Sequence, residues 1–130
     1  MNPWVALVVW STVCLLLATT FIVGRARARY GVKAPAISGH PEFERAYRVQ
    51  MNTIEQAIMF LPAFLLAASL SRHDIACVLG AIWLLGRIGY IVAYLRNPAS
   101  RGPAFVIAML AFAGLLIQSA WGIAWRFMLS

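Results

Sequence analysis

Polar side chains gather in one short stretch of this chain, FERAYRVQMNTIEQAI (43–58), which leads into an apolar run. Arg48, Asn52 and Glu55 are spaced i, i+4 and i+7, so a helix places all three on one face. Gln50 lies on a different side of the same helix. Guanidinium groups bind carboxylates and a carboxylate binds an ammonium group, so this face is suited to a charged polar ligand.

A second set of polar residues repeats the pattern further along the chain. Arg87, Tyr90 and Tyr94 are spaced i, i+3 and i+7, and Arg101 follows in a short link. An ionisable group at the centre of a membrane helix costs about 2.5 to 3.5 kcal/mol, so such groups usually face a protein interior or a water-filled cavity. One explanation is that Arg87 pairs with Glu55 and joins two helices. The surplus of polar groups favours the other explanation, a pocket for a charged polar ligand.

Four apolar segments must position these residues. The 130 residues are 62% hydrophobic and 12% charged, whereas soluble domains average about 25% charged residues. We therefore predict an all-α integral membrane protein whose helices each span about 20 mostly apolar residues. The second segment reaches that length only by including the polar stretch. We predict one membrane domain over residues 1–130, with helices at about 3–23, 44–70, 74–95 and 104–127.

Short links separate the second helix from the third and the third from the fourth. They cover residues 71–74 and 96–103, and short links imply antiparallel neighbours in a four-helix bundle. We expect Asp74 to be the N-cap of the third helix. The connection from Gly24 to Pro41 contains several Gly and Pro residues, so we expect an irregular loop there.

The net charge of +7 comes mostly from two connections on one side of the bundle. Only Arg72 and Arg126 lie near the opposite side. By the positive-inside rule the basic connections and the pocket face the cytoplasm, in a multi-pass protein that we expect in a bacterial inner membrane. The excess charge is then a topology signal and a contact for anionic lipid, and we expect no nucleic-acid partner. The basic residues of the two connections are Arg25, Arg27, Arg29, Lys33, Arg45, Arg48, Arg96 and Arg101.

Metal chemistry is not expected from this sequence. His40 and His73 fall on opposite sides of the membrane in this topology, so they cannot share a metal ion. The sequence also has no glycine-rich phosphate loop and no paired catalytic carboxylates.

Two sequence blocks resemble the MAPEG family, the membrane-associated proteins of eicosanoid and glutathione metabolism, in its microsomal glutathione transferase and leukotriene-C synthase branch. The first block is F-E-R-x-Y-R-x-Q-x-N-x-x-E, which runs from Phe43 to Glu55. The second is R-x-x-Y-x-x-x-Y with an arginine seven residues later, which runs from Arg87 to Arg101. One position departs from the leukotriene-C synthase pattern, because Gln56 stands where that pattern has a tyrosine.

The resemblance implies a homotrimer of four-helix subunits with glutathione, the co-substrate, bound between neighbouring subunits. It implies that Arg101 activates the thiol of glutathione for attack on a lipophilic substrate. A glutathione transferase or peroxidase is therefore the expected function, and a non-catalytic lipid- or glutathione-binding membrane scaffold is the alternative. The residues that the resemblance assigns to glutathione binding are Arg48, Asn52, Glu55, Tyr90, Tyr94, Gln50, Arg29 and Arg87.

Overall fold

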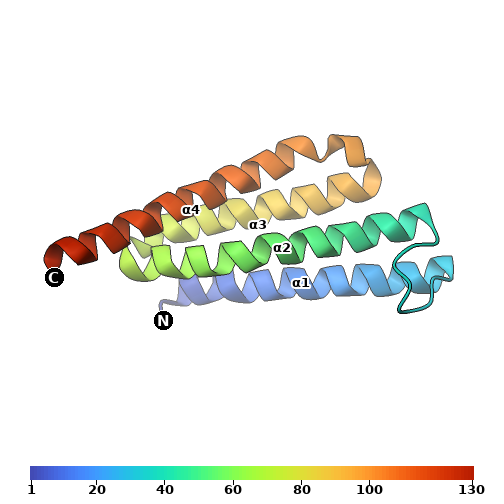
Figure 1. Cartoon of the computed structure of the whole chain (residues 1–130), viewed down its shortest axis with the longest axis horizontal. Coiled ribbons are helices and arrows are strands. Elements are labelled where there is room, and N and C mark those ends of the chain that lie inside the picture. The colour runs from blue at the N-terminus through green and yellow to red at the C-terminus, as the bar shows by residue number, and fades with distance from the viewer.

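The computed structural model describes residues 1–130 as four long helices that run antiparallel to their neighbours (Figure 1). Both chain termini lie at one end of the bundle, and we call the other end the basic end because it holds the two basic connections. The all-helical prediction is confirmed, and all four helices are long and apolar enough to cross a membrane. The helices are α1 (Pro3–Tyr30), α2 (Pro41–Leu70), α3 (His73–Arg96) and α4 (Gly102–Leu129), with the 3-10 turn η1 (Pro98–Ser100) before α4.

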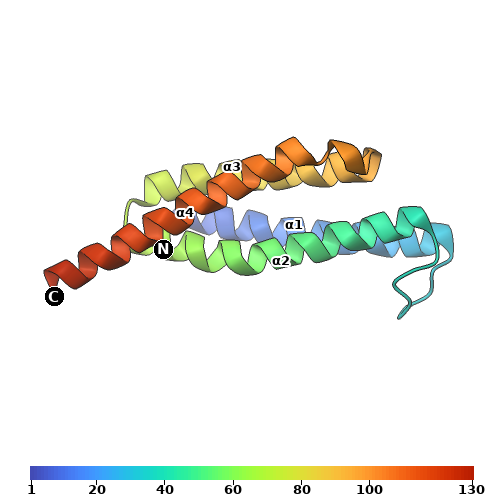
Figure 2. The same cartoon turned by 45° about the horizontal axis from the view of Figure 1, so that its top comes forward.

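The helices form two layers, with α1 beside α2 and α3 beside α4 (Figure 2). Helix α2 contacts all three of the others. Large side chains fill the space between the layers, and Phe60 stacks on Trp83 with ring centroids 3.8 Å apart. Many large apolar side chains face outward instead, among them Leu110 and Ile117. An apolar outer surface is what a bilayer requires, because lipid tails replace water as the solvent there.

Helix α1 extends seven residues beyond its predicted end at residue 23 and stops at Tyr30. The expected irregular loop therefore begins only at Gly31, whose φ of 68° lies in the left-handed region and ends the helix. Apolar length marks only the part of the helix inside the membrane. The following RARAR segment consists of arginine and alanine, which are strong helix formers, so the helix continues beyond the membrane surface.

Helix α2 begins at Pro41, three residues before its predicted start at residue 44. Proline suits this first position because its fixed φ matches the helix and its missing N–H would have no partner there. The His40 side chain caps the helix, accepting a hydrogen bond at Nδ1 from the Glu42 backbone N–H at 3.1 Å. The polar stretch is thus helical from its first residue.

The expected N-cap role of Asp74 is wrong. Arg72 occupies the N-cap position of α3, and Asp74 lies inside the first turn. There its carboxylate pairs with Arg72 through two contacts of 2.6 and 3.2 Å. An acidic residue in the first turn is favoured by the positive end of the helix dipole, which explains why the helix can begin before Asp74.

Close contact between α3 and α4 fixes how Arg87, Tyr90 and Tyr94 on α3 lie relative to Arg101, which precedes α4. A Cβ atom added to Gly86 would lie 3.0 Å from the backbone nitrogen of Ala108 and 3.2 Å from the carbonyl oxygen of Ala104. Only glycine allows the helices to approach so closely. This contact lies one turn before Tyr90 and near the start of α4, so it sets the distance between Tyr90 and Arg101.

Candidate functional site

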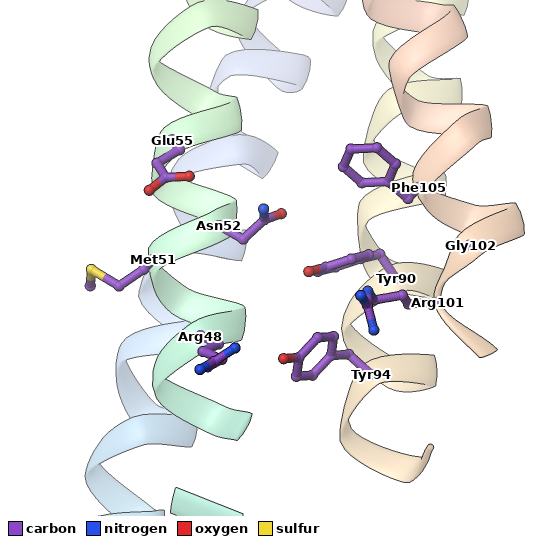
Figure 3. Close-up of a pocket in the computed structure, with 9 residues that line it drawn as sticks. All are labelled: Arg48, Met51, Asn52, Glu55, Tyr90, Tyr94, Arg101, Gly102 and Phe105. Carbon is purple, nitrogen blue, oxygen red and sulfur yellow. The ribbon is translucent and has the colours of Figure 1, made fainter. Parts of the chain in front are cut away.

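A cavity of about 570 Å³ opens between α2, α3 and α4 at the basic end (Figure 3). Six of the nine predicted site residues line it. Helix α2 provides one wall, and α3 with the start of α4 provides the other. The structure therefore brings together residues from both sequence blocks. The lining residues are Arg48, Met51, Asn52, Glu55, Tyr90, Tyr94, Arg101, Gly102 and Phe105.

The wall formed by α3 is aromatic. Tyr90 and Tyr94 lie one turn apart on α3, with ring centroids separated by 5.7 Å, and Phe105 of α4 lies 6.0 Å from Tyr90. Both tyrosine rings are almost completely buried, at 4% and 9% exposure. Their hydroxyl groups point across the cavity toward α2 (Figure 3). The buried rings are held in place by packing, while the hydroxyl groups are available to a ligand.

Arg101 lies at the entrance to the cavity, just before α4. Its guanidinium group is 5.4 Å from the centre of the Tyr94 ring, and its Nη1 donates a hydrogen bond of 2.8 Å to the carbonyl oxygen of Pro98. A guanidinium group has five N–H donors, so this single bond leaves most of them free. Arg101 is thus both fixed in position and able to bind an anion.

The charges in the cavity are not neutralised within the subunit. Neither Arg48 nor Glu55 takes part in a salt bridge, since the two salt bridges of the subunit lie elsewhere. Both side chains are exposed. The cavity therefore offers two arginines, Arg48 and Arg101, and one carboxylate, Glu55, to a ligand. This balance is complementary to a ligand with more carboxylates than ammonium groups.

Arg87 lies behind the cavity wall rather than in it. It is completely buried, and its Nη2 donates hydrogen bonds of 2.9 Å to Asn52 Oδ1 and to Thr53 Oγ1. Its guanidinium group also lies 4.2 Å from the centre of the Tyr90 ring. The alternative pairing of Arg87 with Glu55 is not formed. Arg87 instead links α3 to α2 through neutral groups and supports two residues of the cavity.

The bond from Arg87 determines how the Asn52 amide is oriented. A guanidinium group has donors only, so the amide must present its carbonyl oxygen to Arg87. The Asn52 NH₂ group then has no protein acceptor in the subunit and remains for a ligand. Asn52 is therefore a donor toward the cavity, and it is suited to a carbonyl or carboxylate oxygen.

Two of the predicted site residues lie elsewhere on the subunit. Gln50 Nε2 donates a hydrogen bond of 3.3 Å to Thr20 Oγ1 on α1. Arg29 lines a separate hollow between α1, α2 and α3. Gln56, where the resemblance departs from the leukotriene-C synthase pattern, is not part of the cavity lining either.

Sequence reasoning missed some functional neighbours. Phe105 and Met51 line the cavity, and Thr53 holds Arg87. Phe105 lies four residues after Arg101, so helical spacing from Arg101 would have placed it on the same side. Thr53 carried no such signal, because its role depends on Arg87 reaching it from another helix.

The sequence model of the MAPEG family matches residues 5–121, which is most of the chain. The chain belongs to the MAPEG family. Membership in this family of membrane-associated proteins agrees with the four apolar helices, and the protein is an integral multi-pass membrane protein.

Individual relatives of this MAPEG protein have similar lengths. An uncharacterised protein of Synechocystis is 42% identical over 123 residues, covering 95% of this chain and 90% of the relative. Human microsomal glutathione S-transferase 2 is 34% identical over 106 residues, covering 82% of this chain and 72% of the relative. Mouse leukotriene C4 synthase is 30% identical over 123 residues, covering 79% of this chain and 82% of the relative.

Proposed function

We propose that this MAPEG protein is a glutathione transferase that binds glutathione in the cavity between α2, α3 and α4 and converts its thiol into a nucleophilic thiolate. The observation that carries the proposal is the set of unpaired charges on Arg48, Glu55 and Arg101 around one cavity. The names of two relatives, microsomal glutathione S-transferase 2 and leukotriene C4 synthase, support the same class of reaction.

The charges of glutathione complement those of the cavity. Glutathione carries two carboxylates, one ammonium group and a neutral thiol, so it needs more cationic than anionic partners. Arg48 is suited to a carboxylate, since a guanidinium group binds it through two parallel hydrogen bonds. Glu55 is suited to the ammonium group, and the Asn52 NH₂ group is suited to a carbonyl or carboxylate oxygen. Tyr90 and Tyr94 add two hydroxyl groups on the opposite wall.

Arg101 is the residue that we expect to activate the thiol. A free cysteine thiol has a pKa of about 8.5, and an adjacent guanidinium group stabilises the thiolate and lowers that value. A decrease of about two pKa units corresponds to about 2.7 kcal/mol. Arg101 is already positioned for this by its bond to Pro98 and its contact with Tyr94. The proton leaves to water through the exposed entrance, and the thiolate is the nucleophile.

The second substrate in this proposal is a lipophilic electrophile that reaches the site from the bilayer. The thiolate sulfur attacks an electrophilic carbon of the substrate, a carbon–sulfur bond forms, and the leaving group or the opened ring takes the electron pair. Holding both reactants together removes much of the entropic barrier. Reduction of a lipid hydroperoxide is the related possibility, since it begins with the same thiolate attacking a peroxide oxygen.

A homotrimer belongs to the same proposal, because the cavity is open on the side of the subunit. A neighbouring subunit would cover it, and Gln50 would then reach glutathione only from that neighbour. By the positive-inside rule we expect the cavity on the cytoplasmic side, where glutathione is available. We leave Arg29 out of the proposed glutathione site because it lines a different hollow, on the face of α1 opposite to Thr20, the partner of Gln50. We assign Arg87 to support of Asn52 and Tyr90 rather than to direct contact with glutathione.

The test is to add glutathione to the purified protein and record two signals. We expect an ultraviolet absorption band of the thiolate and conjugation of a generic aryl halide. A scaffold would bind glutathione without either signal. Glutathione binding without a thiolate band and without conjugation would therefore favour the scaffold over the transferase. Absence of glutathione binding would reject both functions.

A further inference from the structure

Two hollows lie in line along α1 on the side of the bundle, separate from the glutathione cavity. The deep hollow, of about 510 Å³ between α1 and α3, is lined almost entirely by apolar residues, including Leu15, Leu84 and Ile88. The outer hollow, of about 320 Å³ at the basic end, lies between α1, α2 and the end of α3 and contains Arg25 and Arg29. Neither hollow shares a residue with the cavity between α2, α3 and α4.

The two hollows lie on one stripe of each helix. On α1 the lining residues Leu15, Ile22, Arg25 and Arg29 follow the spacing of a single helical face. Ala18 falls on the same stripe between the two hollows, and its side chain is small and exposed. On α3 the stripe likewise continues from the deep hollow to Leu95 in the outer one. We call the two hollows and the stripe between them the crevice, which is apolar at depth and cationic at its outer end.

The cations of the outer hollow are free to bind a ligand. Arg25 makes no hydrogen bond or salt bridge in the subunit, and Arg29 contacts only the face of the Tyr30 ring, at 5.6 Å from its centre. One acidic residue, Glu42, also lines this hollow, but it already pairs with Arg45 at 3.3 Å. The two free guanidinium groups lie one helical turn apart, and guanidinium groups bind phosphate oxygens well.

The crevice has the dimensions of one membrane leaflet. Fourteen residues separate Arg25 from Ser11, the residue of the deep hollow on α1 that is farthest from the basic end, and a rise of 1.5 Å per residue gives about 21 Å. Half of a bilayer of about 40–45 Å, headgroups included, is also about 20–22 Å. When Arg25 lies at the level of the lipid headgroups, Ser11 lies near the middle of the bilayer.

We propose that this crevice binds one anionic phospholipid from the leaflet at the basic end. Arg25 and Arg29 hold its phosphate group, and one acyl chain lies between α1 and α3 against Leu15, Leu84 and Ile88. The match of charge, depth and length identifies the ligand as a membrane phospholipid with a net negative headgroup. The proposal does not depend on turnover of glutathione.

Native mass spectrometry of the detergent-purified protein tests this site. The protein is titrated with phosphatidylglycerol or with phosphatidylcholine of the same acyl chains, and bound lipid is counted. We expect phosphatidylglycerol to bind more tightly. The double variant Arg25→Gln/Arg29→Gln should lose about 30-fold in affinity for it, which is two charges at about 1 kcal/mol each.

Two control variants separate the crevice from general surface charge. Lys33→Gln/Arg96→Gln removes the same net charge from the same end, outside the crevice, and should bind phosphatidylglycerol like the unmodified protein. Ala18→Phe fills the crevice without a change in charge and should also weaken binding. Equal binding of the two lipids, equal losses in the two double variants, or unchanged binding in Ala18→Phe would each overturn the site. If a second copy of the chain covered the crevice, the two lipids would bind equally.

Discussion

Arg87 Nη2 donates a hydrogen bond of 2.9 Å to Oδ1 of Asn52, from a completely buried position on α3 to the wall of a cavity on α2. The bond joins the two sequence blocks of the site at one point. It also fixes the Asn52 amide with its oxygen toward Arg87, so its NH₂ group serves the cavity. Two of the predictions below depend directly on this relationship.

Asn52→Asp should weaken glutathione binding at least tenfold without unfolding the protein. The aspartate still accepts the hydrogen bond from Arg87, but it replaces an NH₂ donor by an oxygen, which repels the carbonyl or carboxylate oxygen of the ligand. Isothermal titration with glutathione measures the change. Gln56→Glu is the matched control, because it makes the same amide-to-acid change outside the cavity lining. Unchanged affinity in Asn52→Asp would mean that the Asn52 NH₂ group does not contact glutathione.

Arg87→Met should leave the bundle folded and weaken glutathione binding by about 1.5 to 3 kcal/mol, the value of a hydrogen bond to a charged group. The two remaining buried nitrogens of the guanidinium group, Nε and Nη1, have no hydrogen-bond partner. Burial of a charge that no opposite charge compensates is costly, so an apolar side chain at this position should not destabilise the bundle. The melting temperature in detergent and the KM for glutathione measure the two effects. A loss of melting temperature with an unchanged KM would assign Arg87 a structural role alone.

Glu55→Gln should reduce glutathione affinity at least tenfold and leave the melting temperature nearly unchanged. Glu55 is exposed and takes part in no salt bridge of the subunit, so its charge contributes little to the fold. The measurement is a comparison of glutathione with an analogue that lacks the amino group. The variant should bind the analogue almost as well as the unmodified protein does. A large drop in melting temperature would show that Glu55 holds the bundle together.

Arg101→Ala should retain glutathione binding within a few fold and lose the thiolate band. Without the guanidinium group the thiol of bound glutathione returns toward its ordinary pKa of about 8.5. The remaining activity should therefore continue to rise at pH values where the activity of the unmodified protein has levelled off, because the thiolate forms only at higher pH in the variant. Arg101→Lys should restore part of the band, and Arg96→Ala serves as a control on the same end of the bundle. Normal activity at neutral pH in Arg101→Ala would remove Arg101 from thiol activation.

Gly86→Val should destabilise the bundle by about 1 to 3 kcal/mol, the usual effect of overpacking a tight contact. The added side chain meets the backbone of Ala108 at 3.0 Å, so α3 and α4 must separate next to the site. Thermal unfolding in detergent measures the loss. Gly24→Ala is the matched control, because a Cβ there meets nothing within 4 Å and alanine favours the helix. Equal stability of the two variants would show that the α3–α4 contact is not limiting.

Much of this protein was determined by the sequence itself. The apolar content and the segment lengths indicate membrane helices, because each apolar segment is about as long as a spanning helix and a helix satisfies its own backbone hydrogen bonds in a bilayer. The spacing of Arg48, Asn52 and Glu55 places their side chains on one face of α2. The spacing of Tyr90 and Tyr94 likewise places both on one face of α3. These are local properties, since 3.6 residues per turn convert spacing directly into direction.

Helix ends were less predictable than helix positions. Apolar length gave the extent of each helix within the membrane, but α1 continues through Arg25, Arg27 and Arg29 and ends at Tyr30, just before Gly31. The C-terminal end of α1 depends on helix propensity and on Gly31, a single residue with positive φ, rather than on hydrophobicity. Asp74 likewise suits both an N-cap and a first turn, and the sequence does not distinguish these two positions.

Only the tertiary structure decided what each polar residue does. Arg87 shares the spacing of Tyr90 and Tyr94, yet it turns into the protein and binds Asn52 and Thr53, whereas the two tyrosines face the cavity. Arg29 belongs to the same set of basic residues as Arg101, yet it lines the crevice beside α1. Spacing fixes the direction of a side chain on its own helix, but the partner on the other side depends on how the helices pack.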